Sequence, residues 1–365
     1  GIILANSVNK YLNFYGVACG LNNFIFTNND SAYETAISLF EKGISVKIID
    51  IRKKSNSIIV KQSEKLGINI YWNSTVTNTF GYRKIKSIEI MNLSNDGSNV
   101  EGNKTILNCD CLAISGGWTP MVHMHTQSGG KLNFRENDQV FIPKEQSTDK
   151  ISVGSCNGEL ELDDVIKNTN IQIKNFLNIK DSDYDNININ CSKELDKRNI
   201  WLLPNHLPLG KTKSYVDFQN DSTAKDIKLA LQEGFRSIEH VKRYTTTGMA
   251  TDQGKLSNMH ALGIVAETAG VKMGTLGTTT FRPPFTPLTF GSIVGRNVGK
   301  YFDIIRKTPM HDWHVDNKAE FENVGQWKRA WYYPKNNENM HQAVQRESKE
   351  ARDSAGILDA STLGK

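Results

Sequence analysis

The feature that most restricts the fold is an ordered series of local signals near the N-terminus. Residues 23–27 form a short β-rich run, and residues 28–31 have the chemistry of a turn and a helix cap. Residues 32–42 then carry apolar side chains at helical spacing, and Gly43 ends that helix. Because residues 46–50 form a second β-rich run, the series predicts one βαβ half-unit of a parallel sheet.

The same unit bears on nucleotide binding. A dinucleotide site needs glycines at the first turn, since they let the backbone approach the pyrophosphate at a helix N-terminus. The turn at residues 27–31 has no glycine. Asp50, however, follows that turn by about 20 residues, the spacing of a ribose-binding acid. These residues favour a retained structural Rossmann unit and leave a dinucleotide site as the alternative.

Composition excludes several classes of protein. The chain has 365 residues and a formal net charge of +5, and its basic residues form no long run, so no nucleic-acid partner is predicted. No stretch approaches about 18 uninterrupted apolar residues, so no membrane span is predicted. The five cysteines lack a repeating spacing, which fits a reducing cytoplasm rather than a disulfide framework. The pair Cys109 and Cys111 indicates a strand near its core more than a metal site.

Further elements follow from periodicity and turn chemistry. Near Thr223 a capping box with Asp226 predicts the start of a helix that Gly234 ends. Strands are expected at residues 68–72, 85–91, 105–109, 111–115, 151–155 and from 356, and helices at 61–67, 237–244, 258–269 and 340–355. The pair of strands at 85–91 and 105–109 is expected to be antiparallel. Residues 168–199 are expected to hold helical pieces and a polar linker.

Two later segments carry candidate chemistry. Residues 278–287 are rich in proline, which excludes a helix interior, and Arg282 among them could pair with a phosphate or carboxylate. A surface linker that packs between domains is the alternative. His311, Asp312 and His314 precede several aromatic residues, and packing of these rings is favoured over a metal site. No catalytic triad or zinc pattern is visible, so neither catalytic nor metal residues are predicted.

Several stretches resemble the alpha subunits of heterotetrameric sarcosine oxidases. They are residues 11–17, 26–33, 115–120, 216–221, 233–237, 242–255, 281–287 and 324–329. The likeness spans nearly the whole chain. It implies a multidomain α/β protein: a two-dinucleotide-domain, flavoprotein-like Rossmann region, a small helical ferredoxin-like module without a cluster, and the start of an aminomethyltransferase-like folate domain.

The resemblance also implies domain bounds. Residues 1–22 and 115–205 would be the C-terminal parts of an NAD-binding domain of FAD type, and residues 23–114 a second Rossmann-like domain. Residues 206–275 would be the helical module, 276–305 a connector and 306–365 the beginning of the folate domain. The chain is thus expected to be a piece lacking both termini, with its folate-contacting residues beyond Lys365.

The implied function is that of one subunit in a cytoplasmic complex. The complex would oxidise sarcosine to glycine and hydrogen peroxide and pass the one-carbon unit to tetrahydrofolate. This chain would bind NAD and carry the folate domain, and a partner beta subunit would hold FAD, with FMN at the interface and two small subunits completing the heterotetramer. The alternatives are a subunit of a related N-methyl-amine or opine dehydrogenase, or a non-catalytic scaffold for assembly and folate channelling.

Individual residues follow by position within the resemblance. Around the NAD, Ser155, Leu160 and Leu162 would line the site, and Gly154 and Gly158 would allow close backbone approach. Arg282 would contact the interface that holds FMN. In cluster-bearing relatives four cysteines hold iron and sulfur, and here those places are taken by Asp217, Gln219, Asp252 and Ser257. Because such a cluster normally takes four thiolates, no iron–sulfur cluster is expected.

Overall fold

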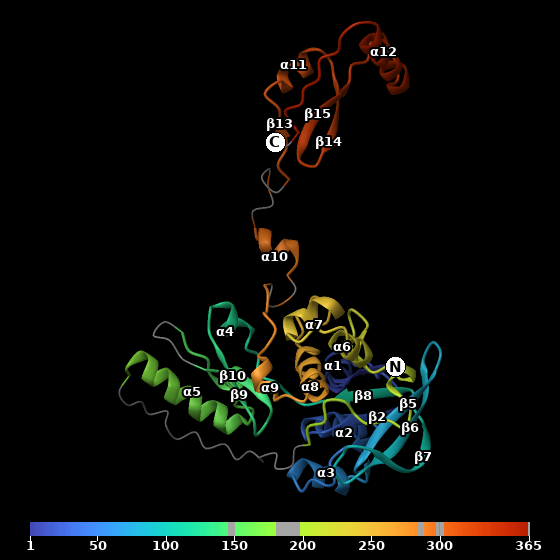
Figure 1. The fold of residues 1–365 in the computed structure, drawn as a ribbon, viewed down its shortest axis with the longest axis vertical. Coiled ribbons are helices and arrows are strands. Elements are labelled where there is room, and N and C mark those ends of the chain that lie inside the picture. The colour runs from blue at the N-terminus through green and yellow to red at the C-terminus, as the bar shows by residue number, and fades with distance from the viewer. Residues whose placement is uncertain are drawn as a thin grey trace. The chain divides into compact units, whose positions relative to one another are not determined.

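The chain divides into two units, Gly1–Pro287 and Leu288–Lys365, each described by itself (Figure 1). The computed structural model describes residues 1–144, 150–179, 198–283, 286, 288–296, 299 and 303–363. Among these residues, no helix combines the length and the apolar character needed to cross a bilayer.

A parallel five-stranded sheet forms the first part of the N-terminal unit (Figure 1). Its strands, in spatial order, are β1 (Ile2–Leu4), β8 (Cys111–Ser115), β2 (Asn22–Thr27), β3 (Ser45–Asp50) and β4 (Asn69–Tyr71). The helices that follow β1, β2 and β3 are α1 (Ala5–Tyr15), α2 (Ser31–Glu41) and α3 (Ile58–Lys65). The predicted βαβ half-unit is therefore confirmed, with β2 and β3 paired in parallel.

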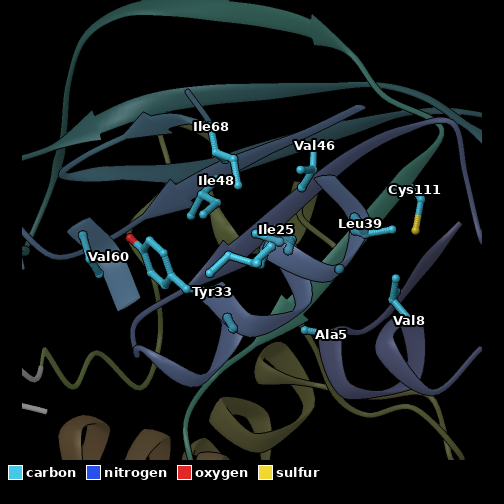
Figure 2. Packing of buried hydrophobic residues seen from close by; sticks show 14 residues of the cluster. Ala5, Val8, Ile25, Tyr33, Leu39, Val46, Ile48, Val60, Ile68 and Cys111 are labelled. Atoms are coloured by element: carbon cyan, nitrogen blue, oxygen red, sulfur yellow. The ribbon is translucent and has the colours of Figure 1, made fainter. Parts of the chain in front are cut away.

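The core of this sheet explains why the local pattern folds as it does. Ile25 and Ile48 on neighbouring strands are fully buried, and Tyr33 and Leu39 of α2 pack against the same cluster (Figure 2). Apolar residues three and four apart lie on one face of a helix, so α2 covers the sheet with that face. Cys111 belongs to this core, and burial raises the pKa of its thiol to about 11. The interpretation of Cys109 and Cys111 as residues near a core agrees with this packing.

A second, antiparallel sheet follows β4. It consists of β5 (Ser74–Gly81), β6 (Ile85–Leu93) and β7 (Val100–Asn108), with β6 in the centre. The antiparallel pairing expected for the second and third of these strands is confirmed. The first strand was not expected, because its many threonines and asparagines give no clear apolar alternation.

The segment after β8 differs from the sequence-based prediction. It forms α4 (His123–Gln127), β9 (Leu132–Arg135), β10 (Val140–Pro143), the 3-10 helix η1 (Gly154–Asn157) and α5 (Leu162–Leu177). The strand predicted at residues 151–155 is wrong, because Gly154 takes a left-handed φ of 66° and begins η1. The helical pieces expected at 168–199 are seen as far as the end of α5, and residues 180–197 lie outside the described residues.

The expected grouping of residues 1–22 with 115–205 as one domain stays a prediction. In the structure, β1 pairs in parallel with β8, and its partners include Leu112 and Ile114. In addition, Val8 of α1 belongs to the core that α2 covers. The first strand and helix therefore pack with the Rossmann-like sheet, because β8 returns between β1 and β2 and pairs with both.

A helical module completes the N-terminal unit. Its elements are η2 (Leu209–Lys211), β11 (Tyr215–Asp217), β12 (Ser222–Thr223), α6 (Ala224–Gln232), α7 (Ile238–Thr245), α8 (Asn258–Ala269) and α9 (Met273–Leu276). The predicted capping box is confirmed: the backbone amide of Asp226 donates to the hydroxyl of Thr223, and the Asp226 carboxylate accepts the Thr223 amide at 2.8 Å. Ile227, Val241 and Leu262 lie in the core of this module.

The C-terminal unit contains a three-stranded sheet. Its elements are α10 (Phe290–Val294), β13 (Arg306–Lys307), α11 (His311–Asp316), β14 (Glu320–Val324), β15 (Trp327–Tyr332) and α12 (Met340–Asp353). The predicted C-terminal helix is confirmed as α12. The strand predicted from residue 356 is wrong: these residues pair with no strand in the described part of the unit, and Ile357 is exposed. A strand requires a neighbour for its amide and carbonyl groups.

Candidate ligand sites

At the carboxyl ends of β2 and β8, polar side chains from the two strands and the segments after them hydrogen-bond to one another. In open parallel sheets the carboxyl ends of the strands are the usual ligand position. Here the Asn29 side chain donates to the backbone oxygen of Ser115 at 3.2 Å and to its hydroxyl at 3.0 Å. The Ser31 hydroxyl donates to the Asn29 side chain and accepts from the Trp118 indole at 2.9 Å. These contacts engage the polar groups at this edge of the sheet with one another.

Asp50, the acid expected to bind a ribose, already accepts hydrogen bonds from protein side chains. Both carboxylate oxygens of Asp50 accept hydrogen bonds from Arg52, and the Tyr33 hydroxyl donates to one of them at 2.8 Å. Arg52 pairs in addition with Asp30 at 2.7 Å. Burial, and then the negative charge of Asp50, raise the pKa of the Tyr33 phenol far above its ordinary value. This buried network favours the interpretation of residues 23–50 as a structural Rossmann unit.

The five residues predicted to contact NAD lie together around η1 and the start of α5. Gly154 opens η1, Ser155 lies within it, and Gly158 follows it with a left-handed φ of 86°. Leu160 and Leu162 are exposed at 43% and 53%. These residues lie close together because they are neighbours in the sequence. The helix α5 has no buried residue.

Gly158 is held by contacts with the protein itself. A Cβ atom at this position would lie 2.7 Å from the Ile142 side chain and 2.8 Å from the Arg135 guanidinium. That guanidinium donates to the carbonyl oxygen of Gly158 at 2.7 Å and pairs with Asp138. The requirement for glycine at this position thus arises from packing against β9 and β10.

A Gly158→Ala substitution is expected to destabilise the N-terminal unit by about 2–4 kcal/mol, because left-handed strain adds to two close contacts. The free energy of unfolding, measured by denaturant titration, reports this. Gly129→Ala is the matched control, since Gly129 has a φ of 81° but open space where its Cβ would lie. It should cost about 1–2 kcal/mol. Equal losses in the two variants would contradict the packing role.

Arg282 lies apart from those five residues, on the connector that follows the helical module. It is exposed, and its backbone amide donates to the Gln253 side chain at 3.3 Å. Lys242 nearby donates to the carbonyl oxygen of Thr280 at 3.0 Å, and burial lowers the pKa of this amine. Glu239 pairs with Arg243 at 2.7 Å and accepts the amide of Thr280. The connector is therefore fixed to α7 through backbone hydrogen bonds.

The positions expected to correspond to cluster cysteines lie in two adjoining segments of the helical module. The buried Asp217 carboxylate accepts backbone amides from Gln219 and Asn220 at 2.9 and 3.0 Å, and from Gly248 at 2.7 Å. The Thr251 hydroxyl donates to the Gln219 side chain at 3.0 Å. In the described ranges no three His, Cys, Asp or Glu side chains are arranged to hold a metal ion. Direct hydrogen bonds thus join the two loops.

In the C-terminal unit, His314 is the centre of a buried polar cluster. Its Nε2 atom lies 3.0 Å from the Asp359 carboxylate, its Nδ1 atom contacts the Tyr333 hydroxyl, and Trp313 packs edge-on against Tyr333. Hydrogen bonds from Ser361 and then from His314 hold the pKa of Asp359 well below its usual range. The sequence did not show this cluster, because its members are far apart in the chain.

The sequence analysis also missed a cavity of about 290 Å³ in the N-terminal unit. It lies at the carboxyl ends of β1 and β8, and α8 borders it as well. The glycine pair Gly116 and Gly117 after β8 was the available signal in the sequence. Its lining includes Leu4, Ala5, Ser115, Gly116, Trp118, Met259, Leu262, Thr279 and Phe281.

A Rossmann-type sheet followed by a helical module places the chain in the class of flavoprotein dehydrogenase folds. The L-proline dehydrogenase structure from P. horikoshii matches with a TM-score of 0.57 and 17% identity, over 81% of this chain and 54% of that chain. The family described as the sarcosine oxidase A3 domain matches residues 211–296, and that of the GCVT N-terminal domain matches residues 310–365.

Relatives in sequence narrow the class to one family. Sarcosine oxidase subunit alpha of Corynebacterium sp. (strain U-96) is 36% identical, and that of Rhizobium meliloti (strain 1021) is 33% identical, over the whole of this chain. The chain is therefore similar over its whole length to sarcosine oxidase alpha subunits. It spans 38% and 36% of the length of these two relatives.

Proposed function

We propose that this chain acts in a sarcosine oxidase complex as its alpha subunit. The complex oxidises sarcosine with O₂ and water to glycine, hydrogen peroxide and formaldehyde, or transfers the one-carbon unit to tetrahydrofolate as methylenetetrahydrofolate. The observation that carries the proposal is the alignment of the whole chain with sarcosine oxidase alpha subunits at 33–36% identity. The match to a GCVT N-terminal domain at residues 310–365 supports the folate role.

The proposed division of labour assigns amine oxidation to a partner. A beta subunit holds FAD, FMN lies at the interface near Arg282, and two small subunits complete the heterotetramer. This chain holds NAD beside η1 and carries the folate domain. No iron–sulfur cluster is expected, because Asp217 and Gln219 take cysteine places and hydrogen-bond to the loops themselves. The expected location remains the cytoplasm.

The residues around η1 fit one part of a dinucleotide better than another. The exposed Leu160 and Leu162 offer an apolar surface to a ring. Asp163 and Asp164 lie in the first turn of α5, where they disfavour a pyrophosphate at the helix N-terminus but could accept ribose hydroxyls. The chain's own contribution is therefore proposed to be ribose and ring contact. A bound NAD would supply a nicotinamide ring to this site.

Two alternatives to the sarcosine oxidase function are also proposed. One is a subunit of a related N-methyl-amine or opine dehydrogenase. The other is a non-catalytic scaffold for assembly and folate channelling, which the hydrogen-bonded side chains at the ends of β2 and β8 would suit. Nucleotide released on denaturing the complex tests the scaffold, since released NAD supports a binding role and its absence favours the scaffold.

The decisive experiment is co-expression of the full natural chain with its flavin-binding partner subunits. Sarcosine is expected to give peroxide at least about tenfold faster than dimethylglycine or opines, because one missing or added group in a fitted site changes the rate by about this factor. The preparation should contain neither iron nor acid-labile sulfide. Lack of turnover with sarcosine would refute the proposed function, and iron with sulfide would refute the assignment of Asp217 and Gln219 to cluster positions.

A further inference from the structure

The 290 Å³ cavity has a lining that suits a negatively charged guest. Residues from the first turns of three helices reach it: Ala5 and Asn6 of α1, Ser31 and Ala32 of α2, and Asn258 and Met259 of α8. Neither α1 nor α8 has an acidic residue in its first turn or a hydrogen bond from a capping side chain. The first turn of α2 contains Glu34 and its N-cap is Asp30, so α2 does not add to the positive field. Helix N-termini carry partial positive charge, so the convergence of α1 and α8 favours an anion.

The charged side chains of the lining agree with this field. Among the described residues that line the cavity none is acidic, and the titratable ones are Lys255 and His123. Burial lowers the pKa of the His123 imidazole, so it is neutral near pH 7. Lys255 is therefore the cationic side chain among the described lining residues.

Thr279 independently indicates a polar ligand in the cavity. This residue lines the cavity and is 6% exposed, and its buried hydroxyl has no hydrogen-bond partner among the described residues. A buried hydroxyl without a partner is costly, and a guest with an acceptor oxygen removes that cost. The hydroxyl can donate to a carboxylate, which forms stronger hydrogen bonds than a neutral oxygen does.

The walls of the cavity are largely apolar. Trp118, Phe141 and Phe281 contribute rings, and Ile114, Met259 and Leu262 contribute aliphatic surface. A volume near 300 Å³ is at the lower end for small-molecule sites, which suits a ligand with one ring. We propose that this cavity binds a small organic carboxylate with a planar apolar body.

The cavity is separate from the residues proposed for NAD and does not depend on the proposed oxidase activity. A zwitterionic amino acid such as sarcosine is expected to bind poorly, because its ammonium group would meet helix N-termini and Lys255. An inorganic anion is also expected to bind poorly, since it leaves the apolar walls unfilled. The two expectations distinguish this site from a substrate site and from a general anion site.

Benzoate is the probe, with calorimetric titration of the full chain as the measurement. Benzoate is expected to bind saturably, and benzamide, which is similar in shape but uncharged, should bind about tenfold or more weakly. Thr279→Val should weaken benzoate binding by about tenfold, because it removes the hydroxyl at nearly constant shape. Thr280→Val is the matched control, because this neighbouring residue is exposed and does not line the cavity. The affinity of this variant for benzoate should be unchanged.

Several results would overturn the proposal. They are no benzoate binding at millimolar concentration, equal binding of benzamide, displacement of benzoate by sarcosine or phosphate at equal concentration, and equal affinities in the two threonine variants. Thermal unfolding of both variants shows whether each is folded. Should Thr279→Val fail to fold, the comparison of benzoate with benzamide on the unaltered chain still decides the outcome.

Discussion

Replacing Arg52 by methionine is expected to lower the free energy of unfolding of the N-terminal unit by about 3–5 kcal/mol. The Arg52 side chain is 2% exposed, and that of its partner Asp50 is fully buried. Without the guanidinium, the Asp50 carboxylate stays buried without its paired cation and loses the guanidinium hydrogen bonds. It keeps those from the Arg52 backbone amide and the Tyr33 hydroxyl. The cost therefore comes from a stranded charge, and denaturant titration measures it.

Two comparisons separate the stranded charge from a loss of packing. The double variant Asp50→Asn with Arg52→Met should be less destabilised than Arg52→Met alone, because it leaves no unpaired carboxylate at position 50. Arg243→Met removes a more exposed guanidinium that pairs with Glu239, and it should cost less than about 1 kcal/mol. A loss at Arg52 no greater than the loss at Arg243 would contradict a buried, energetically coupled network.

Replacing Asp217 by alanine is expected to cost about 3–5 kcal/mol in the helical module. The substitution leaves the amides of Gln219, Asn220 and Gly248 without their acceptor. The buried Gly248 amide costs about 1–3 kcal/mol without a partner, and each of the two part-buried amides costs about 1 kcal/mol. Since these amides come from the two loops that face one another, both loops should loosen. Hydrogen exchange at the three amides and denaturant titration measure the effect.

Conservative and distant variants test the role of the Asp217 carboxylate. Asp217→Asn keeps one acceptor oxygen, so it should protect one loop and lose less stability than the alanine variant. Asp252→Ala removes an acceptor for a single amide, that of Gly254, and should cost about 1 kcal/mol. If exchange at Gly248 stayed slow in Asp217→Ala, the carboxylate would not be what joins the loops.

Local chemistry explains which parts of the fold were predictable. The βαβ unit at β2, α2 and β3 and the helix start at Thr223 depend on spacing and capping within a few residues. The prediction at residues 151–155 failed because an apolar alternation does not reveal that Gly154 adopts a left-handed conformation. The strand expected from residue 356 failed because pairing needs a neighbour that no local pattern supplies.

The candidate sites were less predictable, since they depend on segments distant in the chain. Asn29 hydrogen-bonds to Ser115, which lies 86 positions away. His314 meets Asp359 across 45 positions. The helix ends around the 290 Å³ cavity come from three separate segments. None of these contacts leaves a mark in the spacing of neighbouring residues.

The sequence by itself determined the class of fold, the helical module and the similarity of the chain to sarcosine oxidase alpha subunits. These rest on periodicity, capping residues and long matching stretches, all of which are local or linear properties. Only the tertiary structure decided that Asn29 hydrogen-bonds to Ser115 at the ends of β2 and β8, and that a cavity lies at the ends of β1 and β8. The physical reason is the sheet order, because β8 returns from far along the chain to lie between β1 and β2 and brings Ser115 beside Asn29.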